Sequence, residues 1–225
     1  MQIKTDQITV LITNWNYGCF LREAIDSVLA QTVLPARIII ADDGSTDESL
    51  SIENEYVHAY PDLIMINRQE KRGGLCKNLN DSIKHVETPF FCALAADDKF
   101  APTYIEKALE KISSNDEKLF VVYSDMIKFG NWDGIWAVID WDEQALRQGN
   151  YINGHSVIRK SIFDEVGGYR TEVNGNESFF EDYYLYVDII NLNKGYYGVH
   201  IPEPLVFYRR HDRGHRTDQT DLTTR

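Results

Sequence analysis

Cysteine and long apolar segments are scarce in this sequence. Its 225 residues include three cysteines, and their odd number and spacing match neither a zinc site nor a framework of disulfide bonds. Such cysteine usage is typical of a reducing compartment, so we expect a cytoplasmic protein. No apolar stretch approaches the roughly 20 residues of a membrane-spanning helix, and the first residues show no signal-peptide pattern. The sequence therefore predicts no membrane span and leaves only a peripheral association with membranes open.

Positive charge is also scarce. The chain has 23 lysines and arginines against 35 aspartates and glutamates, and its net charge is −12. An excess of negative charge repels polyanions, which argues against nonspecific binding to nucleic acid or to an anionic membrane. The one dense basic cluster lies at residues 209–216. It could bind an anionic group such as a diphosphate, or it could be a solvated tail that balances nearby acids.

Apolar runs of strand length alternate with segments of helical periodicity over the first 125 residues. The runs rich in Ile, Val and Phe are predicted strands, and they lie at Ile8–Ile12, Arg37–Ala41, Leu63–Ile66, Phe90–Leu94 and Leu119–Tyr123. Predicted helices fill the gaps, and Ser45 or Thr46 is expected to cap the second of them. This alternation predicts an α/β fold in which helices flank a mostly parallel central sheet.

The remaining residues have a different pattern. Residues 126–160 mix aromatic and turn-forming residues, and we expect short strands and loops there. A helix is predicted from Phe180 or Glu181 to Asn193, followed by short strands at Gly198–Ile201 and Leu205–Arg209. We therefore divide the chain into two halves of one domain, residues 1–125 and 126–225, because its length suits a single large domain.

Two acidic pairs, Asp42-Asp43 and Asp97-Asp98, each directly follow a predicted strand. In open α/β sheets, ligands bind in the crevice outside the carboxyl ends of the strands. Acidic pairs gathered at one sheet edge repel each other unless a cation or a donor-rich ligand lies between them. The pattern therefore predicts a site for a metal ion and a polar, phosphorylated small molecule. The alternative is that each pair only forms a turn or caps a helix, although one aspartate would suffice for that.

Several short motifs occur in a fixed order along the chain. They lie at residues 12–16, 24–32, 41–47, 77–78, 97–98, 166–169, 181–183 and 201–205. Together they resemble the inverting family 2 glycosyltransferases with the GT-A fold, a Rossmann-like fold of nucleotide-diphospho-sugar transferases. The resemblance covers about Ile8 to His211. It implies transfer of a sugar, with inversion, from a nucleotide sugar to a glycan, lipid-linked or protein acceptor in polysaccharide or glycoconjugate synthesis.

The resemblance assigns the first half of the chain to the donor and the second half to the acceptor. It implies that Thr13, Asn14, Asp42 and Asp43 recognise the nucleoside, and a UDP-sugar is the default donor. Carboxylates at these positions can accept hydrogen bonds from a base or from ribose hydroxyls.

The second acidic pair is similar to the family's metal-binding signature. The resemblance implies a divalent cation, Mn²⁺ or Mg²⁺, held by Asp97 and Asp98, with Asp97 also binding the donor, and with His211 or else His215 as a further ligand. Oxygen ligands suit these hard cations. The sequence departs from the family pattern at Ala95, which stands where the first aspartate of the signature usually falls and which weakens the case for tight metal binding.

Two cations are expected near the departing diphosphate. Lys77 stands where the family often has arginine, although it lacks the planar guanidinium. Arg210 belongs to the basic cluster and could bind a diphosphate bidentately.

The acceptor hydroxyl must lose a proton as it attacks the sugar. The resemblance gives this role to Asp182, with Glu181 as the other candidate, because a carboxylate with a raised pKa can act as a general base. The alternative is that both residues only stabilise the start of the helix, because the helix dipole favours acidic side chains in the first turn. Trp132, Trp136 and Trp141 could stack on an acceptor sugar or pack in the core.

Two other functions compete with an enzyme. A noncatalytic module that binds sugar nucleotides or glycans on the same fold is favoured by Ala95. A phosphoacceptor receiver domain also uses acidic pairs at strand ends. It fits poorly, because its acidic pair should follow the first strand, which here leads into Thr13-Asn14.

Overall fold

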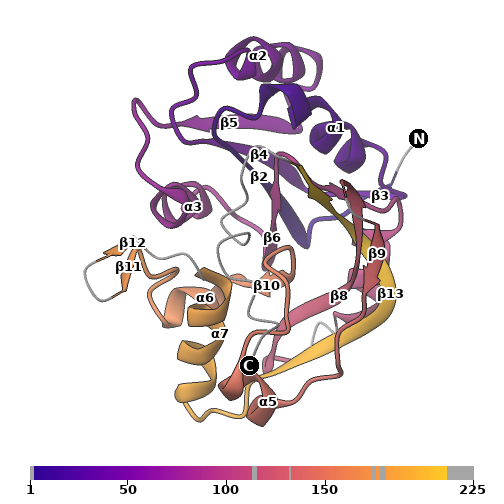
Figure 1. Cartoon of the computed structure of the whole chain (residues 1–225), viewed down its shortest axis with the longest axis vertical. Coiled ribbons are helices and arrows are strands. Elements are labelled where there is room, and N and C mark those ends of the chain that lie inside the picture. The colour runs from indigo at the N-terminus through magenta and orange to yellow at the C-terminus, as the bar shows by residue number, and fades with distance from the viewer. Residues whose placement is uncertain (1–2, 113–115, 132, 174–175, 178–180, 212–225) are drawn as a thin grey trace.

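The computed structural model describes residues 3–112, 116–131, 133–173, 176–177 and 181–211 (Figure 1). The basic residues that follow His211, with the alternative ligand His215, lie outside the described residues, and so does Trp132.

A nine-stranded sheet forms the centre of the described fold. Its strands follow one another in the order β5 (Ile64–Arg68), β4 (Arg37–Asp42), β2 (Ile8–Asn14), β6 (Phe90–Ala95), β10 (Val157–Arg159), β8 (Leu119–Gly130), β13 (Tyr197–Arg210) and β7 (Lys99–Phe100), and β9 (Gly134–Trp136) pairs with β8. The first four are parallel, as the alternating sequence pattern predicts. Their carboxyl ends therefore lie at one edge.

The rest of the sheet is mixed rather than parallel. β10 pairs antiparallel with both β6 and β8, whereas β8 and β13 are parallel along their length. Figure 1 shows the two long strands β8 and β13 running side by side along a curved path. The insertion of β10 joins a late segment of the chain to the middle of the sheet, a nonlocal pairing that the order of elements does not reveal.

Helices cover both faces of the sheet. One face carries α1 (Gly18–Leu29), α2 (Ser49–Ala59) and α4 (Tyr104–Lys111), and the other carries α3 (Leu75–Ile83), α5 (Glu143–Gln148), α6 (Lys160–Glu165) and α7 (Glu181–Asn191). Successive strand residues point to opposite faces, so Val10 and Ile12 belong to the first core and Leu11 to the second. Two small sheets complete the described elements, and they pair β1 (Ile3–Lys4) with β3 (Val33–Leu34) and β11 (Glu172–Val173) with β12 (Asn176–Glu177).

The expected capping of the second helix is wrong. α2 begins at Ser49, and its N-cap residue, Glu48, makes no side-chain capping hydrogen bond. Neither Ser45 nor Thr46 caps α2. The Asp47 carboxylate binds backbone N–H groups at the start of α2 and at the start of α1 instead. It accepts hydrogen bonds from the backbone N–H of Ser49 at 3.0 Å and from that of Gly18 at 2.9 Å. Asp47 thereby fastens the start of α2 to the start of α1.

Other differences lie in the second half of the chain. The short helices α5 and α6 occupy segments for which no helix is predicted, because six residues cover less than two helical turns and show little periodicity. The two short strands expected near the end are one strand, β13. Its pairing with β8 shifts register between Ile201 and Val206, where Pro202 and Pro204 cannot donate ladder hydrogen bonds.

The boundary between the two expected halves falls inside β8, and both halves contribute strands to one sheet. The division at residue 125 therefore stays a functional prediction. None of the helices in the described ranges combines the length and the apolar character that a membrane span requires.

The end of the β8–β13 pair generates a prediction. Gly130 has φ +95°, and a Cβ at this position would lie 2.5 Å from the carbonyl oxygen of Arg210. Gly130→Ala should therefore lower the free energy of unfolding by about 1–3 kcal/mol, measured by chemical denaturation. Gly134→Ala is the matched control, because a Cβ on Gly134 meets nothing within 4 Å. Equal stability of the two variants would show that the close approach is not strained.

Candidate functional site

A cavity of about 610 Å³ opens beside the carboxyl ends of the parallel strands. Its lining includes most of the site residues predicted from the sequence, namely Thr13, Asn14, Asp43, Asp97, Asp98, Glu181 and Asp182. Strands β2, β4 and β6 bring the first five together because they are parallel and in register. The other two come from the start of α7, far along the chain. Asp43, Asp97 and Asp182 thus face one cavity.

Asp43 shapes one end of the cavity. Its two carboxylate oxygens accept hydrogen bonds from the backbone N–H of Gly73 at 2.7 Å and of Gly74 at 2.9 Å. A carboxylate has further lone pairs, so Asp43 can still accept a hydrogen bond from a ligand. Arg72, which precedes these glycines, lines the cavity with its guanidinium 3.9 Å from the ring centre of Trp15.

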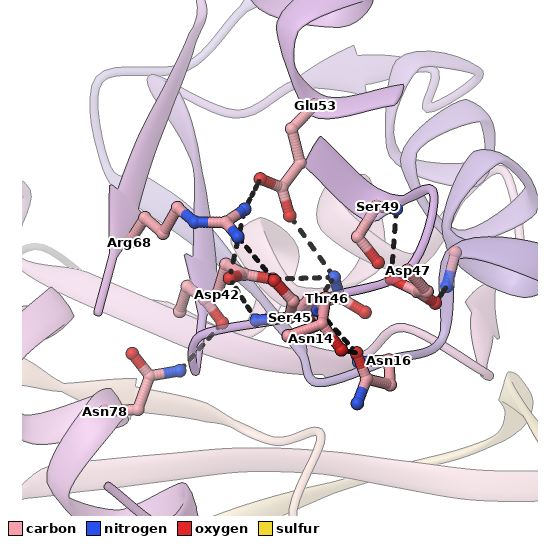
Figure 2. A network of polar contacts seen from close by, with 12 residues as sticks. Asn14, Asn16, Asp42, Ser45, Thr46, Asp47, Ser49, Glu53, Arg68 and Asn78 are labelled. Carbon is pink, nitrogen blue, oxygen red and sulfur yellow. Dashed lines mark hydrogen bonds and ion pairs between the residues drawn. The ribbon is translucent and has the colours of Figure 1, made fainter. Parts of the chain in front are cut away.

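Asp42 lies below the cavity and is not among its lining residues. Its side chain has the same parity along β4 as Ile38 and Ile40, so it points to the face of the sheet that α2 covers. One carboxylate oxygen accepts the Ser45 backbone N–H at 2.9 Å, and the other accepts the Asn14 side-chain amide at 3.0 Å (Figure 2). Asp42 is therefore linked to the cavity through its hydrogen bond with Asn14. Its position does not imply direct contact with a bound nucleotide sugar.

Glu53 is a buried acid that the sequence analysis missed. It extends from α2 into the same network (Figure 2), where it is 0% exposed and accepts the Asn14 amide at 3.2 Å. Burial first, and then the charge of Asp42 and a hydrogen bond to its carboxylate, raise the pKa of Glu53 to about 8. The signal was present in the periodicity of α2, because Glu53 follows Ile52 and shares its buried face with Tyr56.

Asp97 and His211 meet at the opposite side of the strand ends. The Nε2 atom of His211 lies 3.1 Å from an Asp97 carboxylate oxygen, and the imidazole packs against the rings of Tyr17 and Phe20. Neighbouring ligands of an octahedral cation with bonds of 2.1 Å are about 3.0 Å apart. The spacing of these two atoms therefore fits a shared Mg²⁺ or Mn²⁺ ion.

Protein donors already engage both oxygens of Asp98. One accepts the backbone N–H of Arg209 at 2.7 Å, and the other lies 2.8 Å from Nε2 of His155. Within the described ranges, no group of three or more His, Cys, Asp and Glu side chains is arranged to hold a metal. A cation beside Asp97 would thus take few protein ligands and complete its shell with phosphate oxygens and water, as Mg²⁺ usually does.

His155 is a further residue that the sequence analysis missed, and no local pattern marks it. Burial opposes its charged form, but the hydrogen bond to Asp98 and the charges of Asp98, Asp97 and Asp182 outweigh burial and raise the pKa of His155 above its usual value. An imidazolium at this point offsets part of the negative charge that the strand ends gather.

Asp182 lies across the cavity at the start of α7. One of its oxygens accepts the side-chain amide of Asn150 at 3.0 Å, and the other accepts the backbone N–H of Tyr183 at 2.8 Å. Burial raises the pKa of Asp182, and these two hydrogen bonds oppose the shift in part. Asp182 is therefore oriented by its neighbours and is more basic than an exposed aspartate. Its neighbour Glu181 lines the same cavity.

Comparison with known sequences identifies the family. The sequence model described as glycosyl transferase family 2 matches residues 9–170, well over half of the chain. The chain belongs to glycosyltransferase family 2. The match includes both acidic pairs, and it confirms the family expected from the ordered motifs.

Curated relatives agree with this family. An uncharacterised glycosyltransferase of Rickettsia prowazekii (strain Madrid E) is 35% identical over 116 residues, which are 52% of this chain and 35% of that protein. A teichoic acid poly(glycerol phosphate) polymerase of Staphylococcus epidermidis is 29% identical over 119 residues, which are 53% of this chain and 16% of that protein.

Solved structures show the GT-A fold. TarS of S. aureus in complex with UDP-GlcNAc matches with a TM-score of 0.74 at 15% identity, over 95% of this chain and 61% of that chain. The mannosyltransferase PcManGT from Pyrobaculum calidifontis, in complex with GDP-Man and Mn²⁺, matches with a TM-score of 0.69 at 16% identity, over 92% of this chain and 58% of that chain. The chain thus spans less than two thirds of the length of each of these relatives.

Other predicted site residues of this family 2 chain do not line the cavity. Lys77 is exposed on α3, and Arg210 is half-buried at the end of β13. Arg72 is instead the arginine among the described lining residues. Ala95, which replaces an acid of the family pattern, presents a methyl group to the cavity.

The two tryptophans in the described residues have different positions. Trp136 lines the cavity and is 42% exposed, with the Lys128 ammonium 4.6 Å from its ring centre. Trp141 packs edge-on against Phe120, with the ring centres 5.4 Å apart. Trp136 is therefore exposed at the cavity, whereas Trp141 packs against the second core.

The protonation of Glu53 generates a prediction for stability. The folded protein holds this proton up to about pH 8, whereas an unfolded chain releases it near the ordinary value of 4.5. The stabilisation is therefore complete below pH 4.5 and is lost as the pH rises through 8. Between these values the stability of the wild type relative to Glu53→Gln should fall by about 1.4 kcal/mol per pH unit, measured by urea denaturation. A difference that does not change with pH would show that Glu53 is ionised throughout.

Proposed function

We propose that this chain is an inverting glycosyltransferase that transfers a sugar from a nucleotide diphosphate sugar to an acceptor hydroxyl. One observation carries the proposal: Asp43, Asp97 and Asp182, from distant parts of the sequence, line the same cavity. The first two come from strand ends in the half assigned to the donor, and Asp182 comes from the half assigned to the acceptor. A base and a leaving group on opposite sides of one sugar would give a single displacement with inversion.

The nucleotide half of the cavity is proposed to lie around Thr13, Asn14 and Asp43. TarS and PcManGT were solved with UDP-GlcNAc and GDP-Man, which supports a nucleotide sugar as the donor. UDP-sugar is the default that we keep. Arg72 is the cation that we propose beside the anionic part of the donor, in place of Lys77 and Arg210.

Asp97 and His211 are the residues that would hold a divalent cation. The Mn²⁺ in the PcManGT complex and the 3.1 Å spacing of the two side chains support this assignment. When bound, the cation would neutralise charge on the departing diphosphate. Asp98 would keep β13 and His155 in place around it rather than bind the metal directly.

Asp182 is proposed as the general base. Its raised pKa makes it a better proton acceptor than an ordinary aspartate, and Asn150 orients its carboxylate. As the bond to the acceptor oxygen forms, Asp182 takes the hydroxyl proton, and the sugar passes through an oxocarbenium-like state as in glycoside hydrolysis. Glu181, on the same cavity wall, stays the second candidate for the base.

The acceptor is proposed to be a glycan, a lipid-linked saccharide or a protein, in the synthesis of a polysaccharide or glycoconjugate. The teichoic acid poly(glycerol phosphate) polymerase among the relatives supports a role in polymer synthesis. We also propose a cytoplasmic location, because three cysteines with this spacing suit a reducing compartment.

A noncatalytic module that binds sugar nucleotides is the second candidate, and Ala95 favours it. An assay of nucleotide-sugar hydrolysis with and without Mn²⁺ separates the two functions. Turnover supports the enzyme, whereas tight binding without turnover or transfer supports the module.

Asp182→Asn should lower the turnover of the nucleotide sugar at least ~10²-fold, because the amide cannot accept the proton. Binding of UDP, measured by calorimetry, should change only a few-fold. Asp188→Asn is the matched control, since Asp188 lies on the same helix and pairs with Arg170 outside the cavity lining. Turnover that is unchanged in Asp182→Asn would remove Asp182 from the role of base.

The proposed cation site has a separate test. Mn²⁺ should tighten the binding of UDP to the wild type at least about tenfold, and Asp97→Asn or His211→Ala should abolish this gain. His85→Ala is the control, because His85 is exposed near the end of α3 and does not line the cavity. Full enhancement by Mn²⁺ in both site variants would place the metal elsewhere.

A further inference from the structure

A buried acidic group lies directly beneath the proposed nucleotide end of the cavity. Glu53 occupies the buried face of α2, and Figure 2 shows it extending toward Arg68 and Asn14. Both Glu53 and Asp42 are 0% exposed. A helix face that packs on a sheet is normally apolar, and an apolar residue would satisfy packing at this position. The carboxyl group therefore calls for an explanation beyond packing.

The charges around Glu53 do not balance if every acid is ionised. Among the described residues, the charged groups that face it are Asp42 from β4 and Arg68 from β5. One guanidinium nitrogen of Arg68 lies 3.5 Å from Asp42 and 3.6 Å from Glu53. Two buried carboxylates that share one cation retain a proton between them more readily than a second negative charge.

The position of one atom supports the shared proton. The Oε2 atom of Glu53 is buried and has no hydrogen-bond partner. A protonated carboxyl can donate from this oxygen, and the neighbouring Asp42 carboxylate is among the causes that raise the pKa of Glu53. The remaining oxygen, Oε1, then stays an acceptor for Asn14.

Asn14 connects this buried group to the cavity. Its side-chain amide has two hydrogens and lies within reach of three acceptors, Asp42 at 3.0 Å, Glu53 at 3.2 Å and Ser45 at 3.3 Å. The amide oxygen accepts the backbone N–H of Tyr17 at 3.3 Å. Asn14 and Tyr17 both line the cavity. The acceptors on Asp42, Glu53 and Ser45 therefore determine the orientation of the Asn14 side-chain amide, that is, where its NH₂ group and its oxygen point.

We propose that Glu53 is a positioning residue for the nucleotide end of the cavity, where its protonated carboxyl, shared with Asp42, holds the Asn14 amide in the orientation that a nucleoside diphosphate meets. This inference rests on the proposed function, because it places a nucleotide against Asn14. Glu53 does not contact the ligand and acts through Asn14.

Loss of the proton changes the network in a defined direction. Arg68 would then face two full negative charges, on Asp42 and Glu53. The same guanidinium donates a hydrogen bond to the Ser45 carbonyl at 2.5 Å. Ser45 in turn accepts the backbone N–H of Asn16 at 2.9 Å. A shift of Arg68 toward Glu53 would disturb these contacts and, with them, the loop that follows Asn14. Nucleotide binding should therefore weaken on the alkaline side.

Glu53→Gln and Glu53→Leu separate positioning from packing. The glutamine keeps an acceptor for Asn14 and a donor for Asp42, so it resembles the protonated acid without titrating. The leucine keeps the bulk and removes both polar functions. Glu55→Gln is the matched control, because Glu55 lies on the exposed side of the same helix, paired with Arg22. Thermal melts of all four proteins establish that they are folded at the temperature of the binding experiment.

Calorimetric titration with UDP, with Mn²⁺ at fixed concentration, supplies the main readout. The affinity of the wild type and of Glu55→Gln should fall about tenfold between pH 7 and pH 9 relative to Glu53→Gln, and comparison at equal pH cancels the titration of UDP itself. At pH 7, Glu53→Gln should bind like the wild type, and Glu53→Leu at least fivefold more weakly. Wild-type affinity in folded Glu53→Leu would overturn the proposal, and so would an equal alkaline loss in Glu53→Gln.

A second readout needs no ligand. The side-chain amide resonances of Asn14, assigned by their loss in Asn14→Asp, should shift in the free wild-type protein as the pH passes 8 and should stay fixed in Glu53→Gln. If the wild type binds no nucleotide but these resonances titrate, the proposed function fails while the control of Asn14 by Glu53 stands. Resonances that do not respond to pH in the wild type would overturn that control.

Discussion

Carboxylates crowded at one edge of a sheet must each find a positive or hydrogen-bonding partner, and this requirement organises the whole site. The parallel strands β2, β4 and β6 place two acidic pairs at the same edge, and all four aspartates are buried. Asp43 is satisfied by backbone N–H groups of a glycine turn, and Asp98 by Arg209 and His155. Each partner belongs to a different segment, so satisfying the acids also fixes the loops around the cavity.

The same requirement separates supporting acids from those available to a ligand. Asp42 lies outside the cavity lining, and both oxygens of Asp98 are held by Arg209 and His155, so these two acids hold the surrounding segments together. Asp97 and Asp182 both line the cavity, one beside His211 and the other oriented by Asn150 and the backbone of Tyr183. In the proposed function, a divalent cation beside Asp97 would offset negative charge on both the donor phosphates and the nearby carboxylates.

Much of the fold could be predicted from the sequence because its signals are local. The strands of the first half and α7 follow from periodicity and turn residues, and the confirmed family follows from motifs in order. Successive side chains of β4 point to opposite faces of the sheet, so the sequence also indicates that Asp42 and Asp43 point in different directions. What could not be predicted is nonlocal: the insertion of β10 between β6 and β8, and the pairing of Asp98 with His155 from a segment that shows no periodic pattern.

A crystal structure of the protein with UDP and Mn²⁺ tests the central claim most directly. The account predicts the nucleoside against Asn14 and Asp43, the metal ion between the diphosphate and the Asp97–His211 pair, and open space for a sugar and an acceptor hydroxyl on the side of Asp182. A nucleotide bound at another surface, or one whose diphosphate points away from both Asp97 and Asp182, would contradict the account.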